Sequence, residues 1–362
     1  MNSRIAARTR NFFRRHWQGA LRWREKLVFR EEAFHLLLAG FVGVIGGSVN
    51  LFFYYAGELV QRLFLPQPVD PVQAAELFAP WQRLLVPTAG GLVAGLILYW
   101  GYRLIGPQGS SDLLEAVVAG DGRLPFRTES VKTASALVSI ATGASIGREG
   151  GITQLSATLA SKLGQIAKWP PYRLRLLVGC GAAAGIASAY NAPIAGAVFA
   201  SLIVLGNFSM NLFAPLVCAS VVATMMSRSV FGMEPWYHVP LFPPIAGAQL
   251  PWFIAMGLLC GGVSAVFLKF LRAAKQHFNR LRLPLYAKLG LAGLSVGVIA
   301  AVGFPGVCGN GYFVTNAILH GNFEAAPDAF SRLGGLFFAK LLATSITVGA
   351  GTVGGVFTPT MF

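Results

Sequence analysis

Apolar residues form long runs along this chain, and glycine and proline interrupt the runs more often than charge does. The main runs are residues 35–55, 84–99, 176–190, 193–204, 212–226, 251–268, 289–302 and 336–353. Several are shorter than the roughly 20 residues that a helix perpendicular to a membrane needs. Short segments broken by glycine or proline are typical of half-helices that end inside a membrane. The pattern therefore predicts a polytopic helical membrane protein.

The composition supports this prediction. Of the 362 residues, 54% are hydrophobic and 12% are charged, whereas soluble domains carry roughly 25% charged residues. Many of the 43 glycines lie inside the apolar runs, as in residues 90–96 and 181–189, where small residues let helices approach closely in lipid. We expect one all-α membrane domain, residues 35–362, preceded by a basic segment, residues 1–34.

The net charge of +15 is distributed unevenly. Residues 1–32 carry nine Lys or Arg against three acids, and the connections 269–288 and 162–175 carry six and four with no acid. Acids without any Lys or Arg occur in the connections 65–80, 233–250 and 305–330. This alternation is the positive-inside pattern, which places the N-terminus and the basic connections in the cytoplasm. Nucleic acid is not an expected partner, because the basic residues follow membrane ends instead of one folded face.

The basic N-terminal segment is amphipathic and shows no cleavage site of a signal peptide. A helix lying on the inner leaflet and a disordered tail both fit its aromatic residues, which are Phe12, Phe13, Trp17 and Trp23. The chain has no spacing typical of a metal site, a redox pair or a catalytic motif. The cysteines are expected to be buried small hydrophobes; they are Cys180, Cys218, Cys260 and Cys308.

A carboxylate stands out in the apolar middle of the chain, in the sequence GASIGREGG at residues 143–151. Glu149 is the only acid between Glu129 and Glu234. One interpretation is an ion pair with Arg148 in a surface loop. The other is a gate, because a carboxylate at an anion site occupies the site when ionised and vacates it when protonated.

A weak internal repeat favours the second interpretation. Residues 132–151 and 340–359 align with an offset of 340 − 132 = 208, and each contains a lysine, an apolar run and two glycines four apart. Such symmetry is a signature of transporter folds with a site near the membrane midplane. The aligned pairs are Lys132 with Lys340, Gly143 with Gly351, Gly147 with Gly355, Glu149 with Phe357 and Gly151 with Pro359.

Helix starts inside a membrane are natural anion sites. Their first N–H groups lack partners and carry a partial positive charge, and an anion satisfies both. GREGG at 147–151 and GGVFTP at 354–359 are predicted to be loops that open such helices. Asn191-Ala-Pro193 is a third candidate, with Pro193 near the first helical position.

At these residues the chain resembles the CLC family of chloride channels and chloride/proton antiporters. GREGG is similar to the family's GREGP motif, GGVFTP to its GxFxP motif, and residues 182–196 to its half-helix pair. GNGY at 309–312 is similar to the bacterial ClcB-type branch. The resemblance implies an all-α inverted-repeat fold, a homodimer in a bacterial inner membrane, and one pathway per subunit for chloride or a related monovalent anion.

The resemblance also implies roles for individual residues, with no cofactor, metal or catalytic residue among them. Glu149 becomes the gate. The anion filter becomes Ser110, Ser111, Gly147, Arg148, Gly150, Val356 and Phe357. The residues that the resemblance assigns a structural role in the motifs are Gly143, Gly151, Asn191, Pro193, Gly351, Gly354, Gly355 and Pro359.

Three departures from the family pattern matter. The first filter motif, GSGIP, is replaced by GSSDL at 109–113, so Ser110 is the expected filter serine with Ser111 as the alternative. Leu202 and Ile203 stand where antiporters carry a proton-collecting glutamate, which favours a channel over an antiporter with an unusual proton route. The sequence stops just after GGVFTP, so we expect the C-terminal part of the second repeat to be missing. A third hypothesis is an intramembrane enzyme using Ser145 or Glu149, but the sequence offers no partner histidine and no identifiable base for Ser145.

The charge pattern makes a testable prediction about topology. A cysteine introduced at Gln276, in the basic connection 269–288, should not react with an impermeant thiol reagent added outside intact cells. Efficient labelling from outside would show that this connection is extracellular and that the expected topology is wrong.

Overall fold

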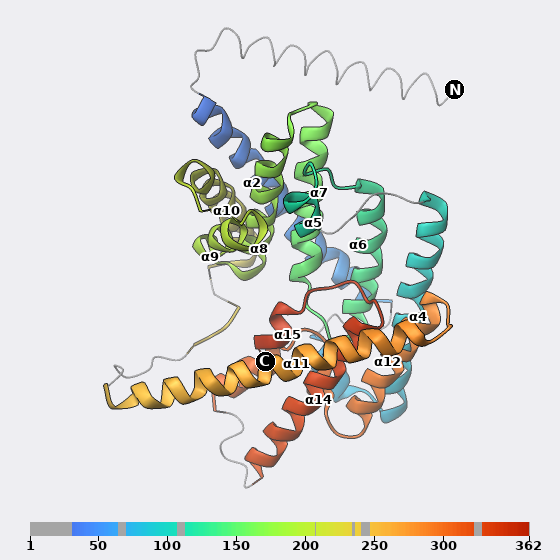
Figure 1. Ribbon diagram of the computed structural model, residues 1–362. Coiled ribbons are helices and arrows are strands. Elements are labelled where there is room, and N and C mark those ends of the chain that lie inside the picture. Colours follow the sequence, from blue (N-terminus) through green and yellow to red (C-terminus); the bar gives the residue numbers. More distant parts are fainter. Residues whose placement is uncertain are drawn as a thin grey trace.

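The computed structural model describes residues 31–63, 70–106, 113–206, 208–233, 236–239, 247–321 and 328–361. Residues 1–30 of the expected basic segment lie outside these ranges. The chain is built of helices (Figure 1), which confirms the predicted all-α class.

The longer helices follow the apolar runs, and several begin before or end after the run. They are α2 (Glu31–Gln61), α3 (Pro71–Leu77), α4 (Pro80–Ile105), α5 (Leu113–Val118), α6 (Phe126–Ala141), α7 (Glu149–Ile166), α8 (Pro171–Tyr190), α9 (Pro193–Phe199), α10 (Met210–Phe231), α11 (Leu250–Arg280), α12 (Leu285–Ala301), α13 (Tyr312–Leu319), α14 (Ala329–Gly349) and α15 (Phe357–Met361). Three further short helical segments are the π-helix Ala200–Val204 and the 3-10 helices Gly247–Gln249 and Pro305–Val307.

Five of the described helices are long and apolar enough to cross a membrane. They span Ala33–Gln61, Pro80–Ile105, Leu212–Phe231, Gly247–Arg280 and Ala329–Gly349. Other helices are much shorter, and α9 and α15 have only 7 and 5 residues. Short helices that end within the bundle are therefore part of the architecture, as the interrupted runs predict.

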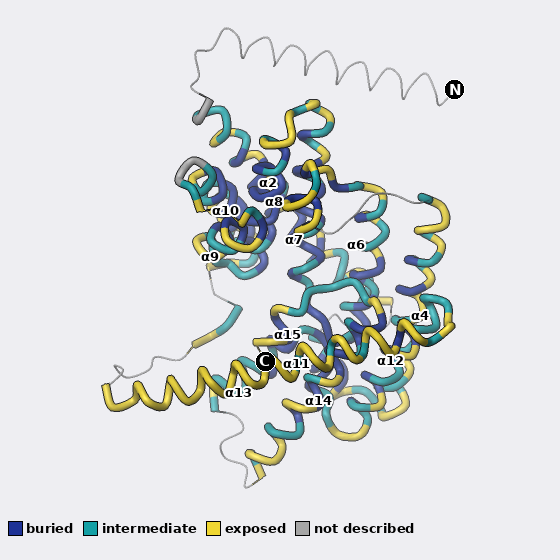
Figure 2. The backbone as a smooth tube through the Cα atoms, in the orientation of Figure 1, coloured by how far each residue is buried: buried dark blue, intermediate teal, exposed yellow. Residues whose placement is uncertain are grey.

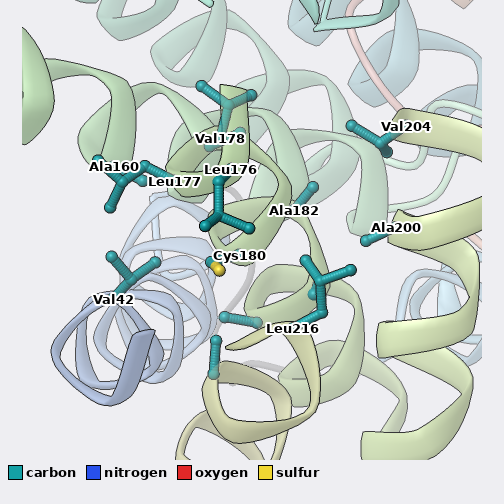
Figure 3. Close-up of a cluster of buried hydrophobic side chains, with 14 of the residues drawn as sticks. Val42, Ala160, Leu176, Leu177, Val178, Cys180, Ala182, Ala200, Val204 and Leu216 are labelled. Carbon is teal, nitrogen blue, oxygen red and sulfur yellow. The ribbon is translucent and has the colours of Figure 1, made fainter. Parts of the chain in front are cut away.

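Small side chains bring the helices close together. A Cβ added to Gly46 on α2 would lie 2.5 Å from Ala184 Cβ on α8, and one added to Gly181 would lie 2.7 Å from the Ser156 carbonyl oxygen on α7. The largest apolar cluster forms around α8, where Cys180 packs as an apolar side chain with Val42 of α2 and other residues (Figure 3). Close backbone contact is the expected way to pack helices without a hydrophobic driving force from water.

The two repeats share their local geometry. Gly143 follows α6 with a φ of 93°, and Gly351 follows α14 with a φ of 95°, a conformation that glycine adopts without steric cost. The next helices begin at Glu149 and Phe357, and 357 − 149 = 208, the offset found in the sequence. The structure therefore supports the repeat that the sequence indicated.

Described residues of two basic connections contact residues near the ends of other helices. Phe34, at the start of α2, packs edge-on against Trp169 in the connection 162–175, with ring centroids 5.9 Å apart. α2 begins, α4 ends and α7 ends on the same side of the molecule (Figure 1). Tyr286, in the other basic connection, packs against Tyr99 near the end of α4, with centroids 5.5 Å apart. Which side of a membrane these connections face stays a prediction.

Helix α11 differs from the others in burial. The apolar stretch of this helix is exposed along its whole length (Figure 2), and its C-terminal part contacts α14, where a Cβ on Gly349 would lie 2.6 Å from Ala274 Cβ. Cys260 lies on α11 and is exposed, so the expectation of a buried thiol is wrong there. The reason is that no described helix covers this part of α11.

Glycine packing between α4 and α12 gives a prediction about stability. A Cβ on Gly293 would overlap the Pro87 carbonyl group, whereas a Cβ on Gly262 of α11 would meet nothing within 4 Å. Gly293→Ala should therefore lower the free energy of unfolding by about 1–3 kcal/mol, and Gly262→Ala should not. Thermal unfolding in detergent measures both, and equal stability of the two variants would contradict the packing described.

Candidate functional site

Two backbone hydrogen bonds join the repeats at the centre of the molecule. Gly147 N–H donates to the Gly355 carbonyl at 2.7 Å, and Gly355 N–H donates to the Gly147 carbonyl at 2.8 Å. The two glycines form an isolated antiparallel bridge, and they are the pair that the repeat aligned. The bridge places the start of α7 beside the start of α15.

The glycines of the two motifs are required by close contact. A Cβ on Gly150 would lie 2.7 Å from the Gly355 nitrogen, and one on Gly354 would lie 2.5 Å from Ile146 Cδ1. Gly151, which replaces the family's proline, faces the ring of Phe53, 2.8 Å from the position of an added Cβ. Larger residues at Gly150 or Gly354 would separate the two loops, whereas a larger residue at Gly151 would press on the Phe53 ring of α2.

Glu149 folds back over this bridge. Its side chain is 3% exposed, and a Cβ on Gly147 would overlap its Oε2 atom. Oε1 accepts a hydrogen bond from the Tyr312 hydroxyl at 3.2 Å, while Oε2 is buried without a hydrogen-bond partner among the described residues. The carboxylate thus lies at the meeting point of the repeats, and the interpretation of Glu149 as a surface-loop residue is wrong.

Arg148 does not pair with Glu149 in the described structure. Its guanidinium carbon lies 4.4 Å from the ring centroid of Trp236, a cation–π contact. The Trp236 ring is in turn stacked on Tyr312, with centroids 5.9 Å apart and planes 25° apart. Arg148 therefore belongs to an aromatic stack that also contains the donor to the gate candidate.

The helix starts near Glu149 supply backbone donors. The first N–H groups of α7, at Glu149, Gly150 and Gly151, have no partner within the helix, and the helix carries partial positive charge there. α15 begins at Phe357, and Pro359 in its first turn has no N–H to offer. This arrangement favours a negative charge at the bridge, supplied either by the carboxylate or by an anion.

A cavity of about 620 Å³ adjoins the bridge. Its described lining contains one carboxyl group, that of Glu149, and is otherwise formed largely by apolar and aromatic side chains. Residues of both repeats contribute to it, including Gly150, Tyr190, Phe199, Ile203, Val356 and Phe357. The described lining contains no Lys or Arg, so the side chains of this cavity offer an anion no positive charge, and the backbone N–H groups at the helix starts are its candidate partners.

Two smaller cavities, of about 330 and 320 Å³, contain charged residues. Both are lined by Asp70, Trp236 and Tyr312, which come from the three acid-bearing connections of the sequence. The first also contains Arg148 and Glu58, and the second contains Arg228. Burial raises the pKa of Asp70, while its hydrogen bond from the Val72 N–H and the charges of Lys340 and Arg148 act in the opposite direction.

The segment around Asn191 links helices. Asn191 ends α8 with a φ of 57°, and its Oδ1 accepts a hydrogen bond from Arg228 Nε at 2.6 Å. α9 begins at Pro193, as predicted from the sequence.

Other sequence-predicted residues take different places. Leu202 and Ile203 lie in the π-helix after α9, and each is 54% exposed. Ile203 lines the large cavity. Ser145 is buried and shares a hydrogen bond with Thr344 at 3.0 Å, so its hydroxyl has a structural partner. Ser110 and Ser111 lie outside the described residues.

Two residues of the site were not predicted by the sequence argument. Tyr312 was noted as part of GNGY, but nothing indicated that it reaches Glu149, 163 residues away. Lys340 was noted only as a repeat partner of Lys132. The two lysines differ, because Lys132 pairs with Glu129 at 3.1 Å while Lys340 Nζ donates to the carbonyl groups of Val307 and Gly309 at 3.0 and 2.8 Å.

A helical membrane protein whose repeats meet at a buried carboxylate between helix starts has the architecture of an ion-transport protein. Residues 90–362 match the family described as "Voltage gated chloride channel". This protein belongs to that family, the CLC proteins, as the sequence motifs predicted.

Individual relatives agree with this membership. A putative chloride channel protein, ClcB-like, from Ralstonia nicotianae is 40% identical over 331 residues, covering 90% of this chain and 76% of the relative. The voltage-gated ClC-type chloride channel ClcB of Salmonella typhimurium is 34% identical, covering 90% of this chain and 78% of that protein. The chain thus spans about three quarters of these relatives' length.

Solved structures show the same fold. A slow cyanobacterial Cl−/H+ antiporter aligns with a TM-score of 0.72 at 24% identity, over 91% of this chain and 76% of that structure. A CLC-type fluoride/proton antiporter aligns with a TM-score of 0.71 at 24% identity, over 92% of this chain and 79% of that structure. At this identity the likeness concerns the fold and not the transport mode.

Proposed function

We propose that this protein conducts chloride across the bacterial inner membrane as a CLC-type channel with Glu149 as its gate. The observation that carries the proposal is the position of Glu149. It is the single carboxyl group in the described lining of the large cavity, at the glycine bridge where two helices begin. The chloride-channel names of relatives that are 34–40% identical support chloride as the ion. A homodimer with one pathway per subunit and a cytoplasmic N-terminus belong to the same proposal.

The gate acts by competition between two anions. When ionised, the carboxylate occupies the positive field of the α7 start and leaves no place for chloride there. When protonated, it loses this attraction and can leave the bridge. Chloride then takes its place beside the backbone N–H groups. Opening should therefore increase as the pH falls.

A channel is favoured over an antiporter because the described lining of the large cavity holds no second carboxyl group. Leu202 and Ile203 carry no carboxyl group, and neither does any other described residue lining the large cavity except Glu149. Protons therefore have no acceptor along this wall through which chloride movement would be coupled to proton movement. A coupled chloride/proton antiporter is the alternative.

Flux measurements distinguish the two modes. In liposomes containing the purified protein, a chloride gradient should drive chloride efflux with little accompanying proton movement, because the wall of the cavity lacks a second proton acceptor. Chloride-selective electrodes and a pH electrode read both fluxes together. A fixed proton-to-chloride ratio that persists across gradients would contradict a channel and support the antiporter.

The gate assignment is tested at Glu149 and at Gly147. Glu149→Gln and Glu149→Ala remove the charge, and Gly147→Ala places a methyl group where the carboxylate lies. All three variants should raise chloride flux at neutral pH several-fold and flatten its pH dependence. The steric clash involves the end of a flexible side chain, so Gly147→Ala should fold normally.

A double variant serves as the control for the gate. If Gly147→Ala acts only by displacing Glu149, Gly147→Ala combined with Glu149→Ala should conduct like Glu149→Ala alone. Wild-type flux and pH response in all three single variants would refute the gate.

A further inference from the structure

We propose that Tyr312 is a positioning residue for the gate. Its hydroxyl holds the ionised Glu149 carboxylate on the glycine bridge and thereby sets the pH at which the pathway opens. This inference rests on the proposed gating function of Glu149.

The first support is the hydrogen bonding of the carboxylate itself. Among the described residues, the Tyr312 hydroxyl is the one hydrogen-bond donor to Glu149, at 3.2 Å from Oε1, and Oε2 has no partner. Both side chains are buried, at 3% and 6% exposure. A hydrogen bond to a charged group contributes more than one between neutral groups, and more still where water is excluded.

The second support is that Tyr312 is held firmly in place. Its ring contacts Trp236 and Tyr237, with centroid distances of 5.9 and 4.9 Å. Its backbone N–H donates to Asn310 Oδ1 at 3.1 Å at the start of α13. Both χ angles of the ring are thereby restricted, so the hydroxyl is directed at the gate at little entropic cost.

The turn that carries Tyr312 is anchored to both repeats. Gly309 N–H donates to the Gly143 carbonyl of the first repeat at 3.2 Å. Lys340 of the second repeat donates to the Gly309 and Val307 carbonyl groups from the other side. The buried Lys340 thus holds the GNGY turn, residues 309–312, in place, and this turn positions Tyr312 relative to the bridge.

The third support is the location of the hydrogen bond between cavities. Glu149 lines the large cavity, whereas Tyr312 lines both smaller cavities. The hydroxyl and the carboxylate therefore meet between the large cavity and the smaller ones. In the proposed function an anion passes between these cavities, so this hydrogen bond must break when the gate opens.

The groups that face Glu149 determine the sign of the expected effect. Arg148 precedes it, and the phenols of Tyr190, Tyr237 and Tyr312 surround it from α8, from segment 236–239 and from α13. Tyr190 shares its hydroxyl hydrogen bond with Thr358 at 2.8 Å, and the Tyr237 hydroxyl has no partner in the described structure. Removal of the Tyr312 hydroxyl therefore disfavours the ionised gate, and protonation then occurs at a higher pH.

Tyr312→Phe tests the inference with a change of one oxygen atom. In reconstituted liposomes, the midpoint of pH-dependent chloride flux should shift upward by about one pH unit, the size expected for losing a hydrogen bond to a carboxylate. Tyr237→Phe is the matched control, because it removes a neighbouring hydroxyl that makes no hydrogen bond to Glu149 in the described structure, and its midpoint should equal that of the wild type. Infrared titration of the carboxylic acid band that Glu149→Gln removes should show the same upward shift directly.

The outcomes separate this inference from the proposed function. If Glu149→Gln abolishes the pH dependence but Tyr312→Phe leaves the midpoint unchanged or lowers it, the gate stands and the role of Tyr312 is wrong. An equal upward shift in Tyr237→Phe also overturns it, because the effect then does not depend on the hydrogen bond. If Glu149→Gln itself leaves the pH dependence unchanged, the proposed gate fails and this inference fails with it.

Discussion

The pair of hydrogen bonds between Gly147 and Gly355 is the contact on which the rest of the site depends. It joins two loops that are 208 residues apart (355 − 147) and lets two helices begin at one point in the interior. Away from water, such helix starts need acceptors for their N–H groups. The bridge satisfies one N–H from each loop and leaves those of the following residues for an anion. The close approach of the backbones requires glycine at Gly150 and Gly355, because a Cβ on Gly150 would lie 2.7 Å from the Gly355 nitrogen and one on Gly355 would lie 2.9 Å from the Gly150 nitrogen.

The two repeats share their architecture, but they carry different residues at the helix start, and this difference determines the chemistry of the site. Glu149 and Phe357 occupy equivalent helix starts, yet only the first offers a charge. Phe357 is 52% exposed and packs edge-on against Tyr190, with ring centroids 5.6 Å apart. An anion site with a carboxylate on both sides would repel its ligand, whereas one carboxylate provides a removable competitor. In the proposed function, this asymmetry gives the site one carboxylate that can be displaced.

A charge in the membrane interior is costly, and the charged side chains there have different partners among the described residues. Glu129 is paired with Lys132, Lys340 is satisfied by backbone carbonyl groups, and Arg148 lies over an indole ring. Glu149 receives one hydrogen bond and keeps an unpaired oxygen atom. Arg148 Nε likewise has no hydrogen-bond partner among the described residues. Glu149 and Arg148, the two charges nearest the bridge, are therefore the least completely hydrogen-bonded of this set, and in the proposed function the incompletely held Glu149 can leave its site.

The sequence by itself determined the class, the helical runs, the repeat offset and the position of the carboxylate. These features are local, because hydropathy, glycine spacing and an isolated acid are read from neighbouring residues. It did not determine that Tyr312 reaches Glu149, that Arg148 turns to Trp236 instead of the adjacent acid, or that Lys340 fixes a turn. Those contacts join segments dozens to hundreds of residues apart. Their partners are chosen by which helices pack together, and packing through small residues leaves no pattern in the sequence that names the partner.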